Sequence, residues 1–390
     1  MISVEAALGH LFDLVSPLGT EAVPLGAASG RVLAQPVTAY RDQPPFPTSV
    51  MDGYAVRSTD IRPGAVLRVV GEAAAGHEWS GALAPGAAVR IFTGAPVPSG
   101  ADRVLIQEDA TRDGETITVG SDPDTALYIR AAGTDFRVGD RIMAPRRLKP
   151  SDLVLAAAMN APHVICSRKP DVVVMSTGDE LVMPGARPRP DQIIASNAFG
   201  LAALLENEGA VVRRLPIARD TCESLDTAFD LARGSDLIVT IGGASVGDHD
   251  LVKDVAQTRG MTPSFYKVAM RPGKPLTAGM MGDTPLIGLP GNPVSAMVCG
   301  IIFVRPTLRA MMGLPAQAAP SHSATLASDI GPNGPREHYM RALLDGDAIR
   351  PFERQDSGLM GILAEANALL VRAPNAPTLR AGSRVDYVAI

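Results

Sequence analysis

The pattern of apolar and polar positions divides the chain into segments of different secondary structure. Residues 3 to 15 place apolar side chains at intervals of three and four, which predicts an amphipathic helix. Between Pro36 and about Pro145 the apolar runs are short and are separated by Pro-Gly, Ser-Gly and Asp-Gly turns, which is typical of a β-rich module. Its clearest expected strands are residues 66 to 70, 88 to 93, 104 to 107 and 116 to 119. Residues 151 to 159 are helical again, so we interpret the β-rich module as an insertion.

The middle of the chain alternates strand and helix. We expect strands at residues 171 to 176, 211 to 217, 236 to 241, 264 to 270 and 285 to 288. The intervening helices are expected at residues 197 to 208, 222 to 232, 251 to 259 and 293 to 312. This alternation predicts an α/β domain with a parallel, doubly wound sheet. A Pro-containing linker at 313 to 320 leads to a small β-rich terminal domain, with strands at 342 to 344, 369 to 372 and 384 to 390 and a helix at 357 to 366.

Composition narrows the class of ligand. A length of 390 residues favours two or three domains, and 46% apolar with 20% charged residues is typical of a globular protein. The chain carries 36 basic and 41 acidic side chains, so no basic field spans it and we expect no nucleic-acid partner. A small-molecule ligand is the expectation that remains.

Cysteine usage and the N-terminal residues indicate the compartment. The three cysteines lie far apart, which fits neither a disulfide framework nor a metal knuckle. Glu5 and Asp13 stand where a signal peptide would need a basic start and an unbroken apolar core. The longest apolar stretch, residues 296 to 304, is half the length of a membrane span. We therefore expect a cytoplasmic protein that does not enter a membrane.

Three loops at the carboxyl ends of expected strands carry polar chemistry, and this edge of an open α/β sheet is where ligands bind. The first, residues 177 to 180, brings a hydroxyl, a flexible backbone and two carboxylates together. The second, residues 242 to 250, has three glycines, whose backbone N–H groups can converge on an anion. The third, residues 288 to 293, is stiffened by two prolines, and Pro293 suits the first position of the helix that follows.

A cluster of cations precedes the third loop. Lys267, Arg271 and Lys274 stand within eight residues of one another. Each feature alone also fits a structural turn or solvated lysines, but together they favour a metal-bridged phosphate or oxyanion site, because carboxylates hold Mg²⁺ while Lys and Arg neutralise an anion. The sequence contains no Walker or dinucleotide-binding motif, no histidine pair typical of catalytic zinc and no nucleophile elbow.

Six motifs stand in the order found in one enzyme family. They are Met51 to Arg57, Arg90 to Ala95, Ser176 to Leu181, Gly242 to Asp250, Arg271 to Pro275 and Gly288 to Ser295. With these motifs the chain resembles the molybdopterin molybdenumtransferases, the MoeA and gephyrin E-domain family, from about residue 3 to the C-terminus. The resemblance implies an enzyme that inserts molybdate into adenylylated molybdopterin in a Mg²⁺-dependent step that releases AMP and yields molybdenum cofactor.

The resemblance also implies an architecture and partners. It suggests an N-terminal linking and dimerisation domain at 1 to 43 with 142 to 170, an inserted β-rich domain at 44 to 141, a doubly wound molybdopterin-binding α/β domain at 171 to 314 and a C-terminal β-barrel-like domain at 315 to 390. It implies a homodimer with a cleft between subunits. A molybdopterin adenylyltransferase and apo-molybdoenzymes are the suggested protein partners.

The positions that match the family's motifs receive roles from the resemblance. It assigns to catalysis Asp52, Thr93, Asp135, Glu180, Asp250, Lys267 and Arg271. It assigns to cofactor binding Arg130, Ser176, Thr177, Gly178, Gly242, Gly243, Ser245, Gly247, Lys274, Pro290, Gly291, Asn292, Pro293 and Ser357. The candidate Mg²⁺ ligands are Glu180, Asp220 and Asp250, and which carboxylate holds Mg²⁺ and which orients molybdate stays open.

Three positions depart from the family's pattern. Pro47 stands where an acidic residue is usual, Ala244 replaces a common valine, and Arg271 stands where lysine is frequent. Arginine keeps the charge and can grip an oxyanion through two N–H groups, but the two cations are not interchangeable. Two other functions stay open: an adenylyltransferase, which would not need the inserted domain, and a binding scaffold, which would not need the clustered carboxylates and cations. Molybdate and tungstate also both remain open as the oxyanion.

Overall fold

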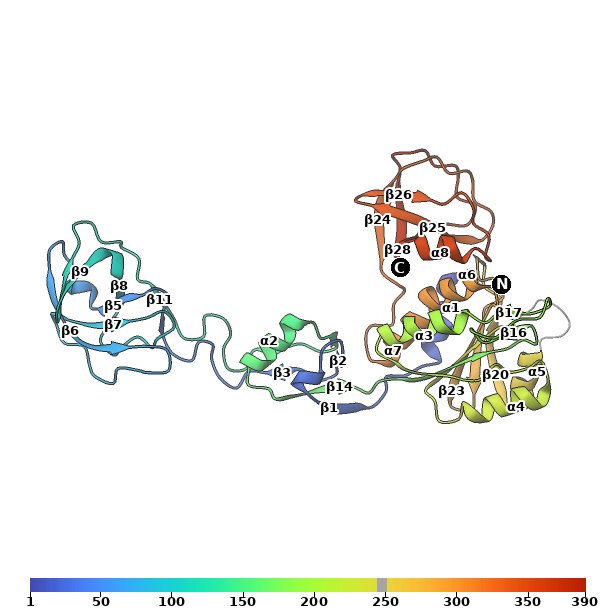
Figure 1. Cartoon of the computed structure of the whole chain (residues 1–390), viewed down its shortest axis with the longest axis horizontal. Coiled ribbons are helices and arrows are strands. Elements are labelled where there is room, and N and C mark those ends of the chain that lie inside the picture. The colour runs from blue at the N-terminus through green and yellow to red at the C-terminus, as the bar shows by residue number, and fades with distance from the viewer. Residues whose placement is uncertain (244–250) are drawn as a thin grey trace. The chain divides into compact units, whose positions relative to one another are not determined.

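The computed structural model describes residues 1–243 and 251–390 (Figure 1). The chain forms two compact units. The first unit consists of Met1–Glu21, Gly30–Ala34 and Cys166–Ile390, and the second unit of Ala22–Ser29 and Gln35–Ile165. The strands near the points where the chain passes between the units are β1 (Thr20–Pro24), β2 (Val32–Leu33) and β14 (His163–Ser167). The four-part division expected from the family resemblance stays a prediction.

The second unit is built around a six-stranded mixed sheet, which confirms the β-rich module. Its strands run in the order β8 (Arg103–Ile106), β5 (Gly53–Val56), β7 (Ala87–Ile91), β6 (Val66–Ala73), β10 (Thr116–Val119) and β9 (Ala110–Asp113). Successive side chains pack on opposite faces: Ala55 and Val89 belong to one apolar cluster, whereas Tyr54 and Ala88 belong to another. Each of the four strands expected from the sequence overlaps a strand of this sheet.

Smaller elements complete the second unit. Two-residue strands pair as β3 (Val37–Thr38) with β12 (Arg141–Ile142) and β4 (Thr48–Ser49) with β11 (Ile129–Arg130). Three further short elements are 3₁₀ turns η1 (Leu25–Ala27), η2 (Ser58–Asp60) and η3 (Gln107–Asp109). Strand β13 (Arg146–Arg147) precedes α2 (Pro150–Ala158), the second helix expected from the sequence. Asp152 caps α2 by accepting the backbone N–H of Lys149 over 2.8 Å.

The first unit contains the doubly wound sheet. Its strands run in the order β18 (Val211–Arg214), β15 (Asp171–Ser176), β19 (Leu237–Ile241), β23 (Thr284–Leu289), β22 (Thr277–Met281) and β20 (Met261–Tyr266). The first four strands are parallel, but β22 is antiparallel to both neighbours, so the expectation of a wholly parallel sheet is wrong at this edge.

The expected strand at residues 264 to 270 is also wrong in its bounds. Strand β20 ends at Tyr266, and Lys267 adopts a left-handed conformation with φ of +65°, which interrupts the extended backbone. The chain then forms the two-residue strand β21 (Met270–Arg271) outside this sheet. Strand β22, which follows, was not expected.

Helices cover both faces of the sheet (Figure 1). The bounds are α1 (Val4–Asp13), α3 (Asn197–Asn207), α4 (Cys222–Leu231), α5 (Leu251–Thr258), α6 (Pro293–Cys299) and α7 (Arg305–Met311). Val172 and Val174 of β15 pack with the cluster that includes α1, α3, α6 and α7, whereas Val173 and Met175 pack with α4 and α5. Alternate side chains of the strand therefore pack into two apolar layers, one on each face of the sheet. This confirms the doubly wound α/β class.

A barrel-like sheet ends the first unit. Its strands are β24 (Ser321–Leu326), β25 (Glu337–Asp345), β26 (Ala348–Pro351), β27 (Ala368–Arg372) and β28 (Arg384–Ala389), with helix α8 (Met360–Glu365) between the third and fourth. The order β25-β26-β24-β28-β27 closes on itself because β27 also pairs with β25. Strand β21 pairs in parallel with the first two residues of β25, Glu337 and His338, which joins the barrel to the α/β domain. The expected β-barrel-like domain is confirmed, although β24 and β26 were not expected.

The helical run through α6 and α7 is the most apolar segment of the fold. A π-helical turn, Gly300–Val304, connects the two helices without a break. Within the described residues, Pro293–Met311 is the one helix long and apolar enough to cross a membrane by length and composition, and 83% of its apolar window is buried in the fold. A core helix of a soluble protein meets the same criteria, so this segment is weak evidence for a membrane span.

Candidate functional site

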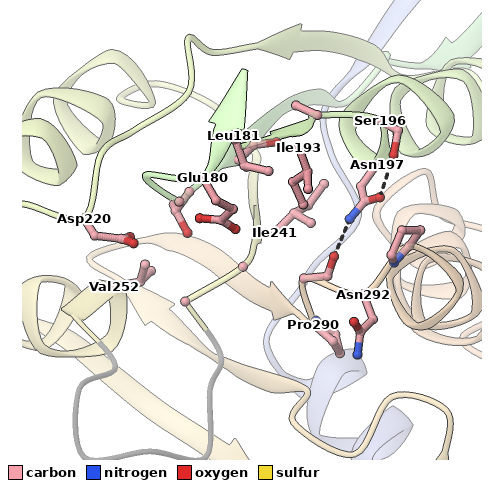
Figure 2. Close-up of a pocket in the computed structure, with 18 of the residues that line it drawn as sticks. Glu180, Leu181, Ile193, Ser196, Asn197, Asp220, Ile241, Val252, Pro290 and Asn292 are labelled. Atoms are coloured by element: carbon pink, nitrogen blue, oxygen red, sulfur yellow. Dashed lines mark hydrogen bonds between the residues drawn. The ribbon is translucent and has the colours of Figure 1, made fainter. Parts of the chain in front are cut away.

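A cavity of about 1120 Å³ opens at the carboxyl ends of the parallel strands of the first unit (Figure 2). The loops after β15, β18, β19 and β23 line it, which is the edge expected from the sequence. It brings together Ser176, Thr177, Gly178, Glu180, Asp220, Gly242, Gly243, Lys274, Pro290, Gly291, Asn292 and Pro293. These twelve residues were all expected in the site.

The turn after β15 carries Glu180 into the cavity. The backbone N–H of Thr177 donates to Ile241 over 3.0 Å, and that of Gly178 donates to Ala218 over 3.1 Å, so the turn is tied to strand β19 and to the loop after β18. Gly178 has φ of +146°, and a Cβ there would lie 2.4 Å from Oε2 of Glu180. Glycine at this position therefore leaves room for the carboxylate.

The turn after β19 approaches Thr177 closely. Gly242 and Gly243 have φ of +99° and +68°, and a Cβ on Gly242 would lie 2.7 Å from the carbonyl oxygen of Thr177. The hydroxyl of Thr177 is buried beside these glycines and finds no hydrogen-bond partner among the described residues. A buried hydroxyl without a partner is costly. Thr177 is therefore an available hydrogen-bonding group next to the cavity.

The opposite end of the cavity is formed by the loop before α6. Asn197, the first residue of α3, donates from Nδ2 to the carbonyl of Gly291 over 2.7 Å, and Ser196 Oγ donates to Asn197 Oδ1 over 3.2 Å. Figure 2 shows Asn197, Pro290 and Asn292 at this end and Glu180 with Asp220 at the other. The loop that presents Asn292 is thus fixed by the start of α3.

The barrel contributes to the same end. Met360 of α8 lines the cavity, and its sulfur lies 3.5 Å from Ser196 Oγ. Ser357 is not among the lining residues, but its carbonyl accepts the backbone N–H of Val294 over 3.2 Å, at the first turn of α6. This bond places Ser357 next to the loop that closes the cavity.

Apolar side chains form one wall of the cavity. Strands β16 (Leu181–Val182) and β17 (Ile193–Ile194) pair in parallel beside the turn that carries Glu180. Ile193 is 58% exposed and Ile194 is 40% exposed. Pockets for organic ligands combine apolar walls with a few polar groups, and this cavity has both.

Two of the three expected cations lie outside the cavity. Lys274 lines it, whereas Lys267 and Arg271 do not. Arg271 on β21 lies beside His338 on β25, and His338 lies opposite Arg372 on β27. Burial, followed by the nearby guanidinium of Arg271 and those of three other arginines, lowers the pKa of His338 to about 4. This row of basic residues is therefore a feature of the barrel and its edge.

The second unit holds four of the expected site residues. Thr93 donates from its backbone N–H and from its hydroxyl to Oδ1 of Asp52, each over 2.8 Å. These two bonds, and the charge of Arg90, hold the pKa of Asp52 below its ordinary value of 3.8. Arg130 lies on β11 opposite Thr48. Asp135 is exposed, and its backbone N–H donates to Gln43 over 2.9 Å.

Three expected residues lie outside the described residues: Ser245, Gly247 and Asp250. Across residues 1–243 and 251–390, no three His, Cys, Asp or Glu side chains come together as a group that could hold a metal ion by themselves. Glu180 and Asp220 are the two carboxylates of the expected metal set that the structure describes, and both line the cavity.

Known proteins resemble this chain along most of its length. Three family models match along the chain: MoeA N-terminal region (domain I and II) at residues 2–160, a probable molybdopterin binding domain at 173–310, and MoeA C-terminal region (domain IV) at 323–390. A molybdopterin molybdenumtransferase of Nostoc sp. is 35% identical over 95% of this chain and 90% of its own length. Molybdopterin molybdenumtransferase 2 of Mycobacterium tuberculosis is 36% identical over 93% of both chains.

The chain belongs to the molybdopterin molybdenumtransferase family. A crystal structure of the molybdopterin biosynthesis MoeA protein from Pyrococcus horikoshii matches all of this chain and 99% of that chain, with a TM-score of 0.85 and 29% identity. A second crystal structure of a MoeA protein from P. horikoshii OT3 matches with a TM-score of 0.87 and 25% identity over both full chains. The family resemblance seen in the motifs is thereby confirmed.

Several residues that line the cavity of this family member were not predicted from its sequence. They are Leu181, Ile193, Ile194, Ala195, Ser196, Asn197, Ile241, Leu251, Val252, Pro275 and Met360. One signal was available: Ser196 and Asn197 open a helix at the carboxyl edge of the sheet, where polar residues at a helix start are common. Met360 and the isoleucines carried no such signal, because only the fold brings them to the cavity.

Proposed function

We propose that this chain inserts molybdate into adenylylated molybdopterin in a Mg²⁺-dependent step that releases AMP and yields molybdenum cofactor. The observation that carries the proposal is the cavity of the first unit, where two carboxylates, a lysine and a glycine turn meet beside an apolar wall. The flat ring of a pterin can pack against the apolar wall, and cations are required to neutralise the charge of its phosphate. Membership of the family supports the proposed transferase reaction, and the polar groups of the cavity support the proposed binding of a charged substrate.

Glu180 and Asp220 fit a magnesium ion. In phosphate sites Mg²⁺ is bound through one or two protein carboxylates, and phosphate oxygens and water supply its other ligands. Both side chains are exposed and line the cavity, so an ion that enters the cavity can reach them. Mg²⁺ held there would neutralise phosphate charge and polarise the phosphate that leaves with AMP.

The chain's own groups position the substrate. The ammonium group of Lys274 attracts the phosphate or the oxyanion, and the Thr177 hydroxyl, which has no partner among the described residues, can form a hydrogen bond beside the cavity. Leu181, Ile193 and Met360 cover apolar ring faces and exclude water. Because the residues lie on strand ends and anchored loops, the reacting groups are held with little reorganisation.

We assign Asp52 and Thr93 of the second unit to the same reaction because both match the family's motifs. A group that orients a cation or a hydrated oxyanion must be ionised, and the two hydrogen bonds from Thr93, which lower the pKa of Asp52, favour that charged form. We also propose a cytoplasmic homodimer that receives its substrate from a molybdopterin adenylyltransferase and delivers its product to apo-molybdoenzymes.

AMP release tests the proposal. The full chain is incubated with adenylylated molybdopterin, molybdate and Mg²⁺, and free AMP is quantified by chromatography. We expect AMP when molybdate and Mg²⁺ are both present, little without either one, and a strong loss in Lys274→Met. The matched variant Lys169→Met removes an exposed lysine outside the cavity and should behave as wild type. AMP release that persists in EDTA would contradict the magnesium assignment.

A further inference from the structure

The geometry points to Arg219 as the positioning residue that sets how Glu180 and Asp220 face each other. The inference rests on the proposed function, in which these two carboxylates serve one reaction. Arg219 lies in the loop between β18 and α4, next to Asp220 in sequence. Its side chain reaches across to the turn after β15, which carries Glu180.

The guanidinium group of Arg219 grips the turn on both sides of Glu180. Its Nη1 donates to the carbonyl of Asp179 over 2.9 Å and lies 3.4 Å from the carbonyl of Leu181. One nitrogen therefore contacts the peptide unit before Glu180 and the peptide unit after Leu181. The carbonyl of Glu180 itself accepts the N–H of Ile193 over 2.8 Å. The backbone around Glu180 is therefore held by both Arg219 and Ile193.

Asp220 is anchored by the same segment. The backbone N–H of Asp220 donates to Oδ1 of Asp179 over 3.3 Å, which forms a second link between the two loops. The backbone N–H of Arg219 donates to Ser224 Oγ over 2.9 Å, and its carbonyl accepts the N–H of Thr221 over 2.7 Å. Thr221 is the N-cap of α4, so Arg219 is fixed to a helix start at its backbone while its side chain holds the other loop.

Such a link offsets charge repulsion between the two loops. Asp179, Glu180 and Asp220 are three exposed carboxylates at adjoining strand ends, and like charges push the loops that bear them apart. A guanidinium group between these loops supplies the opposing charge and a planar set of donors. Lysine could supply the charge, but its ammonium group sits on a flexible stem and lacks the rigid planar group that directs Nη1 at the turn, so Arg219→Lys should replace Arg219 only in part.

The test separates positioning from general stability. Arg219→Met and Arg219→Lys are compared with wild type and with Arg233→Met, which removes an arginine that is 77% exposed and paired with Asp230 near the end of α4. Hydrogen exchange of residues 178 to 182 reports on the turn, and electron paramagnetic resonance reports on the binding of Mn²⁺, used as a probe for Mg²⁺. All measurements use the full chain.

We expect faster exchange at 178 to 182 and about tenfold weaker Mn²⁺ binding in Arg219→Met, the usual range for a lost outer-shell contact. Arg219→Lys should give exchange rates and Mn²⁺ affinities between those of wild type and Arg219→Met, and Arg233→Met should match wild type in both. Unchanged exchange in Arg219→Met would overturn the inference, and so would faster exchange with unchanged Mn²⁺ binding. If wild type binds no Mn²⁺, the magnesium assignment fails and the exchange data alone decide on Arg219. If Mn²⁺ responds as expected but no AMP is released, the proposed reaction fails and the positioning role stands.

Discussion

Thr93 donates two hydrogen bonds to a single oxygen of Asp52, one from its backbone N–H and one from its hydroxyl, both over 2.8 Å. The same arrangement occurs once more in the second unit, where Ser58 donates its N–H over 2.6 Å and its hydroxyl over 2.8 Å to Oδ1 of Asp102. Hydrogen bonds to a carboxylate favour its charged form, so the pKa of each aspartate lies below its ordinary value. One pair matches a family motif and the other does not, which provides a matched control.

We predict that Thr93→Val raises the pKa of Asp52 toward 3.8, because the hydroxyl bond is lost while the backbone bond remains. AMP release should fall, since the carboxylate is no longer fixed. Carbon NMR of the aspartate carboxyl groups as a function of pH measures the shift. Ser58→Ala should raise the pKa of Asp102 and leave both Asp52 and turnover as in wild type. An unshifted Asp52 in Thr93→Val would show that the hydroxyl does not act on it.

Removing one carboxylate from the cavity should raise the requirement for magnesium. Glu180→Gln and Asp220→Asn keep the shape of each side chain but remove a negative charge that lines the cavity. We expect the Mg²⁺ concentration for half-maximal AMP release to rise at least about tenfold in each variant. Glu206→Gln, at an exposed position of α3 outside the cavity, is the control. A normal Mg²⁺ dependence in both cavity variants would remove these residues from the ion site.

The hydrogen bond from Asn197 to Gly291 should matter for substrate binding. Asn197→Ala leaves the Gly291 carbonyl without this 2.7 Å bond, which costs about 1 kcal/mol of stability. The loop that presents Asn292 then loses its anchor. We therefore expect the loss in the free energy of pterin binding to exceed the loss in the free energy of unfolding. Fluorescence titration with molybdopterin and urea unfolding measure the two effects. Asn207→Ala, at the exposed end of α3, should leave pterin affinity unaltered; equal affinities in both variants would count against the anchor.

His338 should make the barrel sensitive to acid. Its pKa is lowered to about 4 in the folded chain, below the ordinary value of 6.5, so the unfolded chain binds the proton first. Stability is therefore complete above pH 6.5 and decreases as the pH falls toward 4. Between pH 7 and 5 the loss due to His338 should be about 2 kcal/mol, at 1.4 kcal/mol per pKa unit.

Urea unfolding of wild type and His338→Gln at pH 7 and pH 5 tests this dependence. The variant cannot take up the proton, so its stability should decrease less over this interval than that of wild type. His163→Gln changes an exposed histidine and should follow wild type. Identical pH dependence in wild type and His338→Gln would mean that His338 titrates normally in the folded chain.

Much of the α/β domain could be predicted because local signals and burial agree there. Strand β15 contains an unbroken apolar run, Val172 to Met175, and its observed bounds match the expected residues 171 to 176. In α1, Ser3 accepts the N–H of Ala6 over 3.1 Å, so the helix begins where its sequence provides a cap. Such elements need no distant partner to be recognised.

The missed elements depend on distant partners. Strand β22 contains Gly279, and a Cβ there would lie 2.5 Å from the carbonyl of Thr262 on β20, so close strand packing selects a residue with low strand preference. Lys267 holds a left-handed conformation that its sequence does not announce. For the site, the loops after parallel strands could be predicted from topology. Met360 could not, because α8 reaches the cavity only through the packing of the barrel.

The reactivation of a molybdenum-free apoenzyme tests the central claim most directly. The full chain, adenylylated molybdopterin, Mg²⁺ and low-micromolar molybdate are combined with the apoenzyme, and its recovered activity is measured against molybdate concentration. We predict saturable, molybdate-dependent reactivation that Lys274→Met loses and Lys169→Met retains. Pterin binding without reactivation, with molybdate and with tungstate in turn, would contradict the transferase function and leave a pterin carrier or scaffold.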